Sequence, residues 1–167
     1  MVSNWEKQIT AEVPRLRRYA RALTQNPSAA DDLVQECLER AWGKQTQWQT
    51  GTNLRAWLFT IVHNCFINET RARNRADEYL DQVKQSETGS YSDSNIELLN
   101  LQQCLQRLSQ EHREVIVLAG LEGLSYQEIA SVIDAPVGTV MSRLSRAREE
   151  LRTLMAHPIP DNVVKLK

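Results

Sequence analysis

Apolar side chains recur at three- and four-residue spacing along most of the chain, which is the period of an amphipathic helix. No long segment alternates apolar and polar residues as a strand does, and only 6 Gly and 5 Pro are present to interrupt helices. The pattern therefore predicts an all-α protein. Its widest apolar stripe lies in residues 53–75 and consists of Leu54, Trp57, Leu58, Ile61, Val62, Cys65 and Phe66.

Residues 86–95, SETGSYSDSN, interrupt this period with small, polar and acidic side chains. Such a composition cannot bury enough apolar surface to fold, so it predicts a flexible linker between two small helical domains. The predicted organisation is a helical domain over residues 1–76, an acidic linker over 77–95, a second helical domain over 96–156 and a C-terminal tail over 157–167.

Several residues suggest where helices begin and end. Pro14 suits the first turn of an arginine-rich first helix, and Ser28 with Asp31 has the spacing of a capping box for the second. Ser94 has the same role at the start of the second domain. Gly123 fits a C-cap at the end of the helix that contains Val115, Ile116 and Leu118.

The stretch LSYQEIASVIDAPVGTVMSRLSRAREEL predicts two helices with a tight turn between them. Ser125 and Glu128 form a capping box, so the first helix begins near Tyr126. Pro136 prevents that helix from continuing, and the second helix extends over Val137 to Leu154. Two short helices joined in this way are typical of a helix-turn-helix that binds DNA.

The outer face of the second helix mixes hydroxyls with guanidinium groups, which suit phosphates and guanine edges. The alternative is a solvated helix face, the usual fate of charged positions. The residues of this face are Thr139, Ser142, Arg143, Ser145, Arg146 and Arg148.

The first domain has a second candidate nucleic-acid surface, where amides lie beside arginines at helical spacing. Its residues are Thr60, Asn64, Asn68, Arg71 and Arg75. In the preceding segment, Trp48 has two possible roles: it covers the core, or it forms part of a pocket for an unstacked base.

An acidic face on the second helix also has two interpretations, a solvated surface or a site for a protein partner. The helix dipole does not explain all of its acidic residues, because some lie far from the helix N-terminus. The face consists of Asp32, Gln35, Glu36 and Glu39.

Composition narrows the chemistry further. The formal net charge of -1 conceals basic segments at 53–75 and 137–153 and an acidic one at 76–97. The three cysteines form no CxxC pair, and His63 and Cys65 point in different directions on a helix, so we expect no metal and no cofactor. No apolar run is long enough for a signal or a membrane span, and no nucleophile and base form a catalytic motif, so we expect a cytoplasmic non-enzyme.

Three segments in this order resemble the extracytoplasmic-function sigma factors, the small two-domain sigma subunits of bacterial RNA polymerase. They are DDLVQECLERAW, NLRAWLFTIVHNCFINETRARNR and LEGLSYQEIASVIDAPVGTVMSRLSRAREEL. The resemblance extends from about Pro14 to Leu154. It departs at Met141, where many relatives carry Arg, and at Ser145, where some have a bulkier residue.

The resemblance implies a non-catalytic subunit that recruits core RNA polymerase to promoters, acts as a monomer when free, and is controlled by an anti-sigma factor. The acidic face would dock on the clamp helices of the largest subunit, and the flap would be a further contact. Asn64, Asn68, Arg71, Arg75 and Trp48 would bind the melted minus-ten element. The face of the second helix from Thr139 to Arg148 would bind the minus-thirty-five element. The protein would lie with the nucleoid in holoenzyme, or at the membrane when an anti-sigma factor holds it there.

Two other functions are consistent with parts of the sequence. A stand-alone helix-turn-helix repressor would leave the acidic face and the Asn/Arg surface unexplained. A sigma-mimicking decoy that sequesters an anti-sigma protein would keep the fold without needing DNA contacts.

Overall fold

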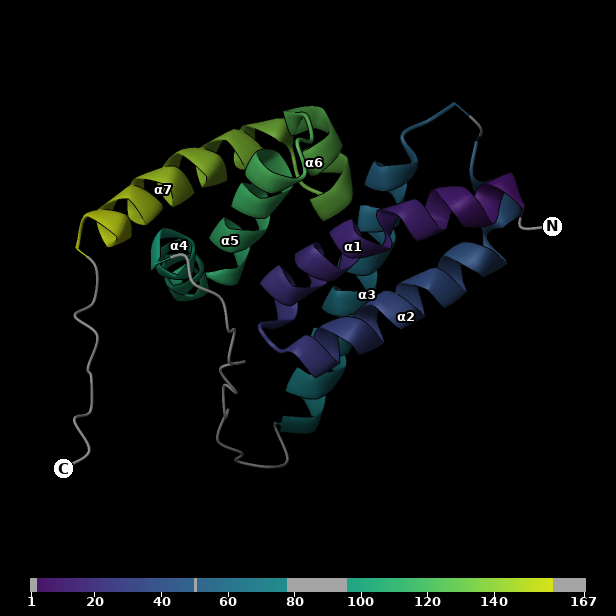
Figure 1. The fold of residues 1–167 in the computed structure, drawn as a ribbon, viewed down its shortest axis with the longest axis horizontal. Coiled ribbons are helices and arrows are strands. Elements are labelled where there is room, and N and C mark those ends of the chain that lie inside the picture. The colour runs from purple at the N-terminus through teal and green to yellow at the C-terminus, as the bar shows by residue number, and fades with distance from the viewer. Residues whose placement is uncertain (1–2, 50, 78–95, 158–167) are drawn as a thin grey trace.

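The computed structural model describes residues 3–49, 51–77 and 96–157 of the chain and is all-helical over these ranges, as predicted. Three helices form an N-terminal unit and four form a C-terminal unit (Figure 1). Short turns over Gln45–Gln47 and Val117–Leu121 are 3-10 and π-helical, respectively. The helices are α1 (Asn4–Thr24), α2 (Pro27–Gly43), α3 (Leu54–Asp77), α4 (Ile96–Arg107), α5 (Gln110–Ile116), α6 (Tyr126–Ile133) and α7 (Val137–Ala156).

Helix α1 begins ten residues before Pro14, so the prediction that Pro14 lies in the first turn is wrong. A capping box at the real start explains the difference: Ser3 Oγ accepts from the amide of Glu6, and the Glu6 carboxylate accepts from the amide of Ser3. Trp5 and Ile9 are buried and anchor this additional segment on the core.

Helix α2 also begins differently from the prediction. Its N-cap is Asn26, whose side-chain oxygen accepts from the amide of Ala29 at 3.0 Å, and Pro27 occupies the first turn. Ser28 is therefore inside the helix, and Asp31 pairs with Arg17 of α1 at 3.5 Å. An Asn-Pro pair outweighs the capping-box spacing because its proline favours the first helical position.

The N-terminal unit buries one apolar face of each helix. The rings of Tyr19 in α1 and Phe59 in α3 meet edge to face at 5.1 Å between centroids, an arrangement that aromatic pairs prefer. Leu33 of α2 is fully buried in the same cluster. The stripe predicted for residues 53–75 is thus a core face, with Leu58, Ile61, Val62, Cys65 and Phe66 buried. Leu54 and Trp57 of that stripe are half-buried, and Phe59, which lies outside it, is also buried.

The C-terminal unit contains the predicted helix-turn-helix. Ser125 and Glu128 form the capping box of α6, and Asp134 ends that helix in the left-handed conformation with φ of 51°. Val140, Leu144 and Ala147 form the buried stripe of α7.

Replacing Ser125 with alanine is expected to lower the free energy of unfolding by about 1 kcal/mol, because the amide of Glu128 loses its side-chain acceptor. Chemical denaturation followed by circular dichroism measures the change. Ser131→Ala is the control, since Ser131 lies in the middle of the same helix and is exposed. Equal stability of Ser125→Ala and wild type would contradict the importance of this cap.

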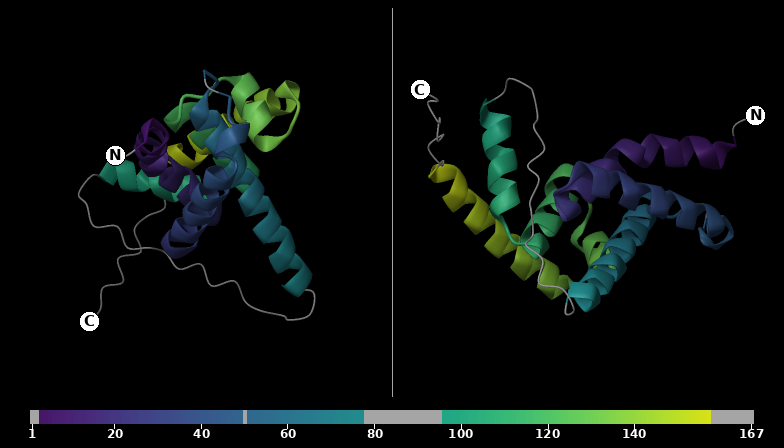
Figure 2. Two further views of the ribbon diagram at one scale, coloured as in Figure 1. Left: turned by 90° about the vertical axis from the view of Figure 1, so that its right-hand side faces the viewer. Right: turned by 90° about the horizontal axis from the view of Figure 1, so that it is seen from below.

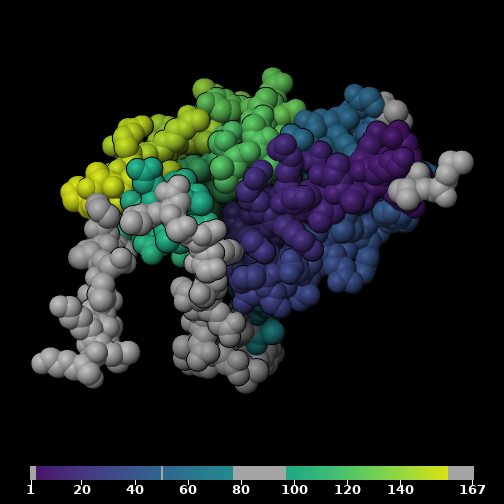
Figure 3. Space-filling view, in the orientation of Figure 1, coloured from purple at the N-terminus to yellow at the C-terminus, as the bar shows by residue number. Residues whose placement is uncertain are grey.

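The two units pack against each other, and their buried apolar residues form one continuous cluster. Helix α3 contacts α6, and α1 contacts α5 and the π-helical turn. In the space-filling view the purple surface of α1 abuts the green surface of the C-terminal unit (Figure 3). Sequence periodicity predicted the two units but not this contact between them.

Three predictions fall on parts of the chain outside the described residues. They are the capping box at Ser94, the acidic linker apart from Asp77, and the C-terminal tail apart from His157.

Candidate nucleic-acid interface

Helix α7 presents a polar face on the side away from its buried stripe. Ser142, Ser145, Arg146 and Arg148 are exposed, and Thr139 is half-buried. At 100° per residue, Ser142 and Arg146 lie near the middle of this face. The structure thus exposes most of the predicted face.

The two flanks of this face differ. Arg143 is half-buried, and its Nη2 lies 3.5 Å from the carboxylate of Glu111 in α5. On the other flank, a shallow groove is lined by Tyr126, Met141, Ser145, Arg148, Glu149 and Arg152. Arg148 therefore points toward α6, whereas Arg143 points toward α5.

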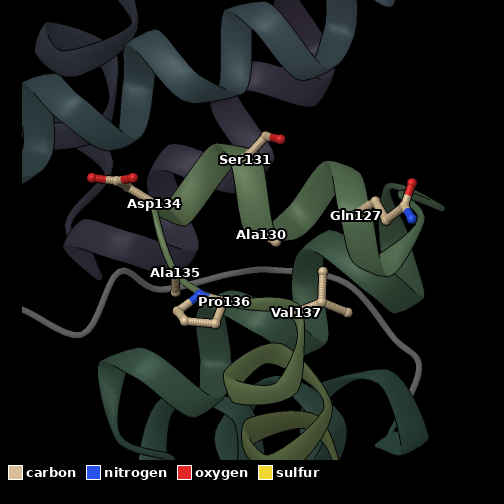
Figure 4. Close-up of a pocket in the computed structure, with 7 residues that line it drawn as sticks. All are labelled: Gln127, Ala130, Ser131, Asp134, Ala135, Pro136 and Val137. Carbon is tan, nitrogen blue, oxygen red and sulfur yellow. The ribbon is translucent and has the colours of Figure 1, made fainter.

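A second hollow lies at the turn between α6 and α7 (Figure 4). Gln127, Ala130 and Ser131 border it from α6, and Pro136 and Val137 border it from the start of α7. Asp134 is the one titratable group in this lining, so the hollow offers no pair of acid and base for catalysis.

Helix α3 presents a second stripe, which begins where the helix packs in the bundle and continues toward its C-terminal end, which extends beyond the bundle (Figure 2). Asn64, Asn68, Arg71 and Arg75 are all exposed, at intervals of four, three and four residues. Thr60 is half-buried, and its hydroxyl donates to the carbonyl of Ala56. The exposed amides and guanidinium groups can donate to bases and phosphates.

Trp48 lies in an aromatic cluster. Its ring centroid is 5.0 Å from that of Trp5, which in turn is 5.9 Å from that of Trp57. Trp48 is half-buried, and the buried indole N–H groups of Trp5 and Trp48 have no acceptor. Trp48 thus packs against the N-terminal core and is only half-buried, a position consistent with both roles considered from the sequence: covering the core and forming part of a pocket for an unstacked base.

The acidic face of α2 is exposed at Asp32, Gln35 and Glu39. Glu36 differs, because its carboxylate lies 2.6 Å from Nη2 of Arg40 one turn later. The face therefore presents the exposed carboxylates of Asp32 and Glu39 and a third, that of Glu36, which forms an ion pair with Arg40.

A buried polar node that helical periodicity does not predict lies between the two units. Glu114 of α5 is buried, and its Oε1 lies 2.5 Å from the hydroxyl of Tyr19 and 2.6 Å from Nδ1 of His63. Burial, together with the adjacent carboxylate, raises the pKa of Tyr19 well above its usual range, so the hydroxyl keeps its proton and donates.

His63 and Cys65, two positions apart on α3, lie in different surroundings. His63 faces Glu114, while Cys65 is buried in the core with a thiol whose pKa is raised chiefly by that burial. Among the described residues, no three His, Cys, Asp or Glu side chains are grouped to hold an ion. Nor does any helix in the described ranges have the length and apolarity needed to span a membrane.

Both halves of the chain match known families. Residues 9–63 match the family described as the sigma2 domain of PhyR, and residues 98–151 match Sigma-70, region 4. The ECF RNA polymerase sigma factor EcfG of Rhodopseudomonas palustris (strain TIE-1) is 40% identical over 149 residues, which cover 88% of this chain and 82% of that protein.

Solved structures of sigma factors also match the fold of this chain. The sigma factor RpoE from Bartonella quintana, solved in complex with the anti-sigma factor NepR, matches with a TM-score of 0.85 and 35% identity, over 92% of this chain and 98% of that chain. CnrH, solved in complex with the cytosolic domain of CnrY, matches with a TM-score of 0.65 and 28% identity, over 90% of this chain and 86% of that chain.

Proposed function

The chain belongs to the ECF sigma factors of bacterial RNA polymerase, and from this membership we propose that it directs core polymerase to a specific set of promoters. The polymerase carries out nucleotidyl transfer, and the chain needs no cofactor of its own. The proposal places the chain in the cytoplasm, on the nucleoid when it is part of holoenzyme.

The observation that carries this proposal is that family membership coincides with three separate exposed polar faces. We propose that α2 docks on the clamp helices of the largest subunit, that α3 binds the melted minus-ten strand, and that α7 enters the major groove of the minus-thirty-five element. The exposed arginines of α3 and α7 suit phosphates and base edges, and the carboxylates of α2 suit a basic protein surface.

Control by an anti-sigma factor is part of the proposal. Among solved relatives, RpoE is described in a complex with the anti-sigma factor NepR, and CnrH in a complex with the cytosolic domain of CnrY. An anti-sigma factor that covers both units of this chain would block its access to polymerase and to DNA together.

The deciding experiment is reconstitution of the full chain with core polymerase, followed by transcription from a library of promoters. We expect new, specific start sites that are absent with core polymerase alone. A stand-alone repressor would bind DNA in the absence of polymerase and would create no start sites, so that result would reject the proposal.

A decoy remains a second candidate because residues 9–63 match the sigma2 domain of PhyR. PhyR is described as an anti-anti-sigma factor in a solved complex with NepR, and its 17% identity to this chain supports a shared fold alone. A decoy would bind an anti-sigma protein and fail to support transcription, whereas the proposed sigma factor does both.

Replacing Asn64 or Trp48 with alanine is expected to reduce open-complex formation more than initial promoter recruitment. Contacts with unpaired bases are worth about 1 to 3 kcal/mol each, and they form only after the strands separate. Permanganate reactivity of the minus-ten region measures melting. Thr10→Ala is the control, because Thr10 is exposed on α1, outside the proposed surface.

A pre-melted promoter completes this test, because it removes the cost of strand separation. If the two side chains bind single-stranded bases, holoenzyme that contains either variant should bind this template more weakly than holoenzyme that contains the wild type. Wild-type behaviour of both variants at every step would show that the surface has no role in melting.

A further inference from the structure

Three carboxylates of the C-terminal unit each receive a donor from the N-terminal unit. Glu114 faces Tyr19 and His63, as described above, and the others are Glu122 and Glu128. We name these cross-unit contacts the domain latch. They lie along the boundary where α1 and α3 meet α5, α6 and the π-helical turn.

Glu122 is the second node, and its side chain has no exposed surface. Arg18 Nε donates to its Oε1 at 2.6 Å, and Arg15 Nη1 lies 3.5 Å from its Oε2. Both arginines come from α1 and remain partly exposed. Separation of the units would leave Glu122 without its two cations.

Glu128 is the third node, at the edge of the interface. Its Oε1 accepts from Nδ2 of Asn53 at 2.8 Å, while its Oε2 serves the capping box of α6. The other side-chain atom of Asn53, Oδ1, accepts from the amide of Ala56 at the start of α3. The contact therefore ties the N-terminus of α3 to that of α6.

The closed arrangement is too small for the proposed function. Minus-ten and minus-thirty-five elements lie about 25 base pairs apart, which is about 85 Å along B-form DNA. A compact chain of this length has a radius of gyration of about 15 Å. Here α3 packs directly on α6, the helix just before α7, so one closed molecule cannot reach both elements.

The covalent connection permits the units to separate. The chain between Asp77 and Ile96 can reach about 60 Å when fully extended. Opening would break the domain latch and expose the apolar residues between the units. The latch therefore opposes the arrangement that promoter binding requires.

We infer that the domain latch holds the free chain in a closed, autoinhibited state, and that this closed state lowers its apparent affinity for core polymerase. The closed state is inferred from the contacts alone, whereas its effect on polymerase binding rests on the proposed function. When only a fraction of molecules is open, the apparent dissociation constant rises by the inverse of that fraction. Weakening the latch should then tighten binding.

The test compares the full chain with two latch variants, Glu122→Gln and the double variant Arg15→Ala/Arg18→Ala. The double variant changes side chains that are partly exposed, so we expect it to fold. It therefore still tests the latch if circular dichroism shows that Glu122→Gln has lost helicity. The control is Glu69→Gln, which removes a carboxylate from an exposed pair with Arg73 within α3.

Small-angle X-ray scattering of the free proteins gives the first readout. Wild type and Glu69→Gln should show the compact radius of gyration of about 15 Å, and the double variant should show a clearly larger one. An extended wild type, or equal dimensions of wild type and double variant, would overturn the latch.

Titration of core polymerase gives the second readout. The double variant should bind about tenfold more tightly than wild type, whereas Glu69→Gln should not differ from it. Larger dimensions with unchanged affinity would overturn the autoinhibitory role. Larger dimensions with no binding of polymerase by any form would support the latch as a domain contact and reject the proposed function instead.

Discussion

Replacing Asp32 and Glu39 together with lysine is expected to weaken binding to core polymerase by about a hundredfold, because like charges brought together at an interface cost several kcal/mol. Both side chains are exposed on α2, so helical content should not change. Single reversals at Asp32 or Glu36 should act in the same direction with smaller effects. Fluorescence titration and circular dichroism measure affinity and helicity on the same samples.

Asp31→Lys is a matched control for this charge reversal. Asp31 lies next to Asp32 on the same helix, but it faces Arg17 of α1 rather than the acidic face. We expect little loss of polymerase affinity in this variant. Equal affinity of the double variant and wild type would remove α2 from the docking surface, and equal losses in the double variant and Asp31→Lys would show a general charge effect.

Helix periods and caps could be predicted where their causes are local. The start of α6 follows from Ser125 and Glu128, three residues apart, and the end follows from Pro136 shortly after it. The predicted start of α1 at Pro14 was wrong, because the capping box formed by Ser3 and Glu6 determines where this helix begins.

The interface between the units could not be predicted in this way. Tyr19 and Glu114 are 95 positions apart, and nothing in the period of either helix marks one as the partner of the other. Tyr19 is buried in the core, and helical periodicity gives no reason for a buried carboxylate beside it. His63, considered as a metal ligand and set aside, belongs to the same node.

For the candidate DNA surfaces, the sequence predicts which side chains are exposed but not what each one contacts. Periodicity correctly placed Asn64, Asn68 and Arg146 on exposed faces, because helical spacing and apolar stripes determine which side is buried. It could not determine the surroundings of each side chain. The ion pair of Arg143 with Glu111 and the contact of Trp48 with Trp5 depend on tertiary packing.

Helix α7 is expected to determine the preference for the upstream promoter element, and the double variant Arg143→Ala/Arg146→Ala should lose it. An arginine that contacts a guanine edge contributes about 1 to 3 kcal/mol of discrimination, so the pair together should relax specificity strongly. Because Arg143 is half-buried and lies beside Glu111 whereas Arg146 is exposed, Arg146→Ala should have the larger single effect.

Arg148 is expected to behave differently, since it lies on the opposite flank and is proposed to contact phosphate. Arg148→Ala should weaken all promoter sequences by similar factors and reduce the salt slope by about one. Arg152→Ala is the control, as its exposed guanidinium pairs with Glu149 toward the end of the helix. Holoenzyme is titrated on promoters varied at each upstream base, at several salt concentrations. If the double variant and Arg148→Ala both retain the base preference and salt slope of wild type, α7 does not bind the upstream element, and its polar face is a solvated surface.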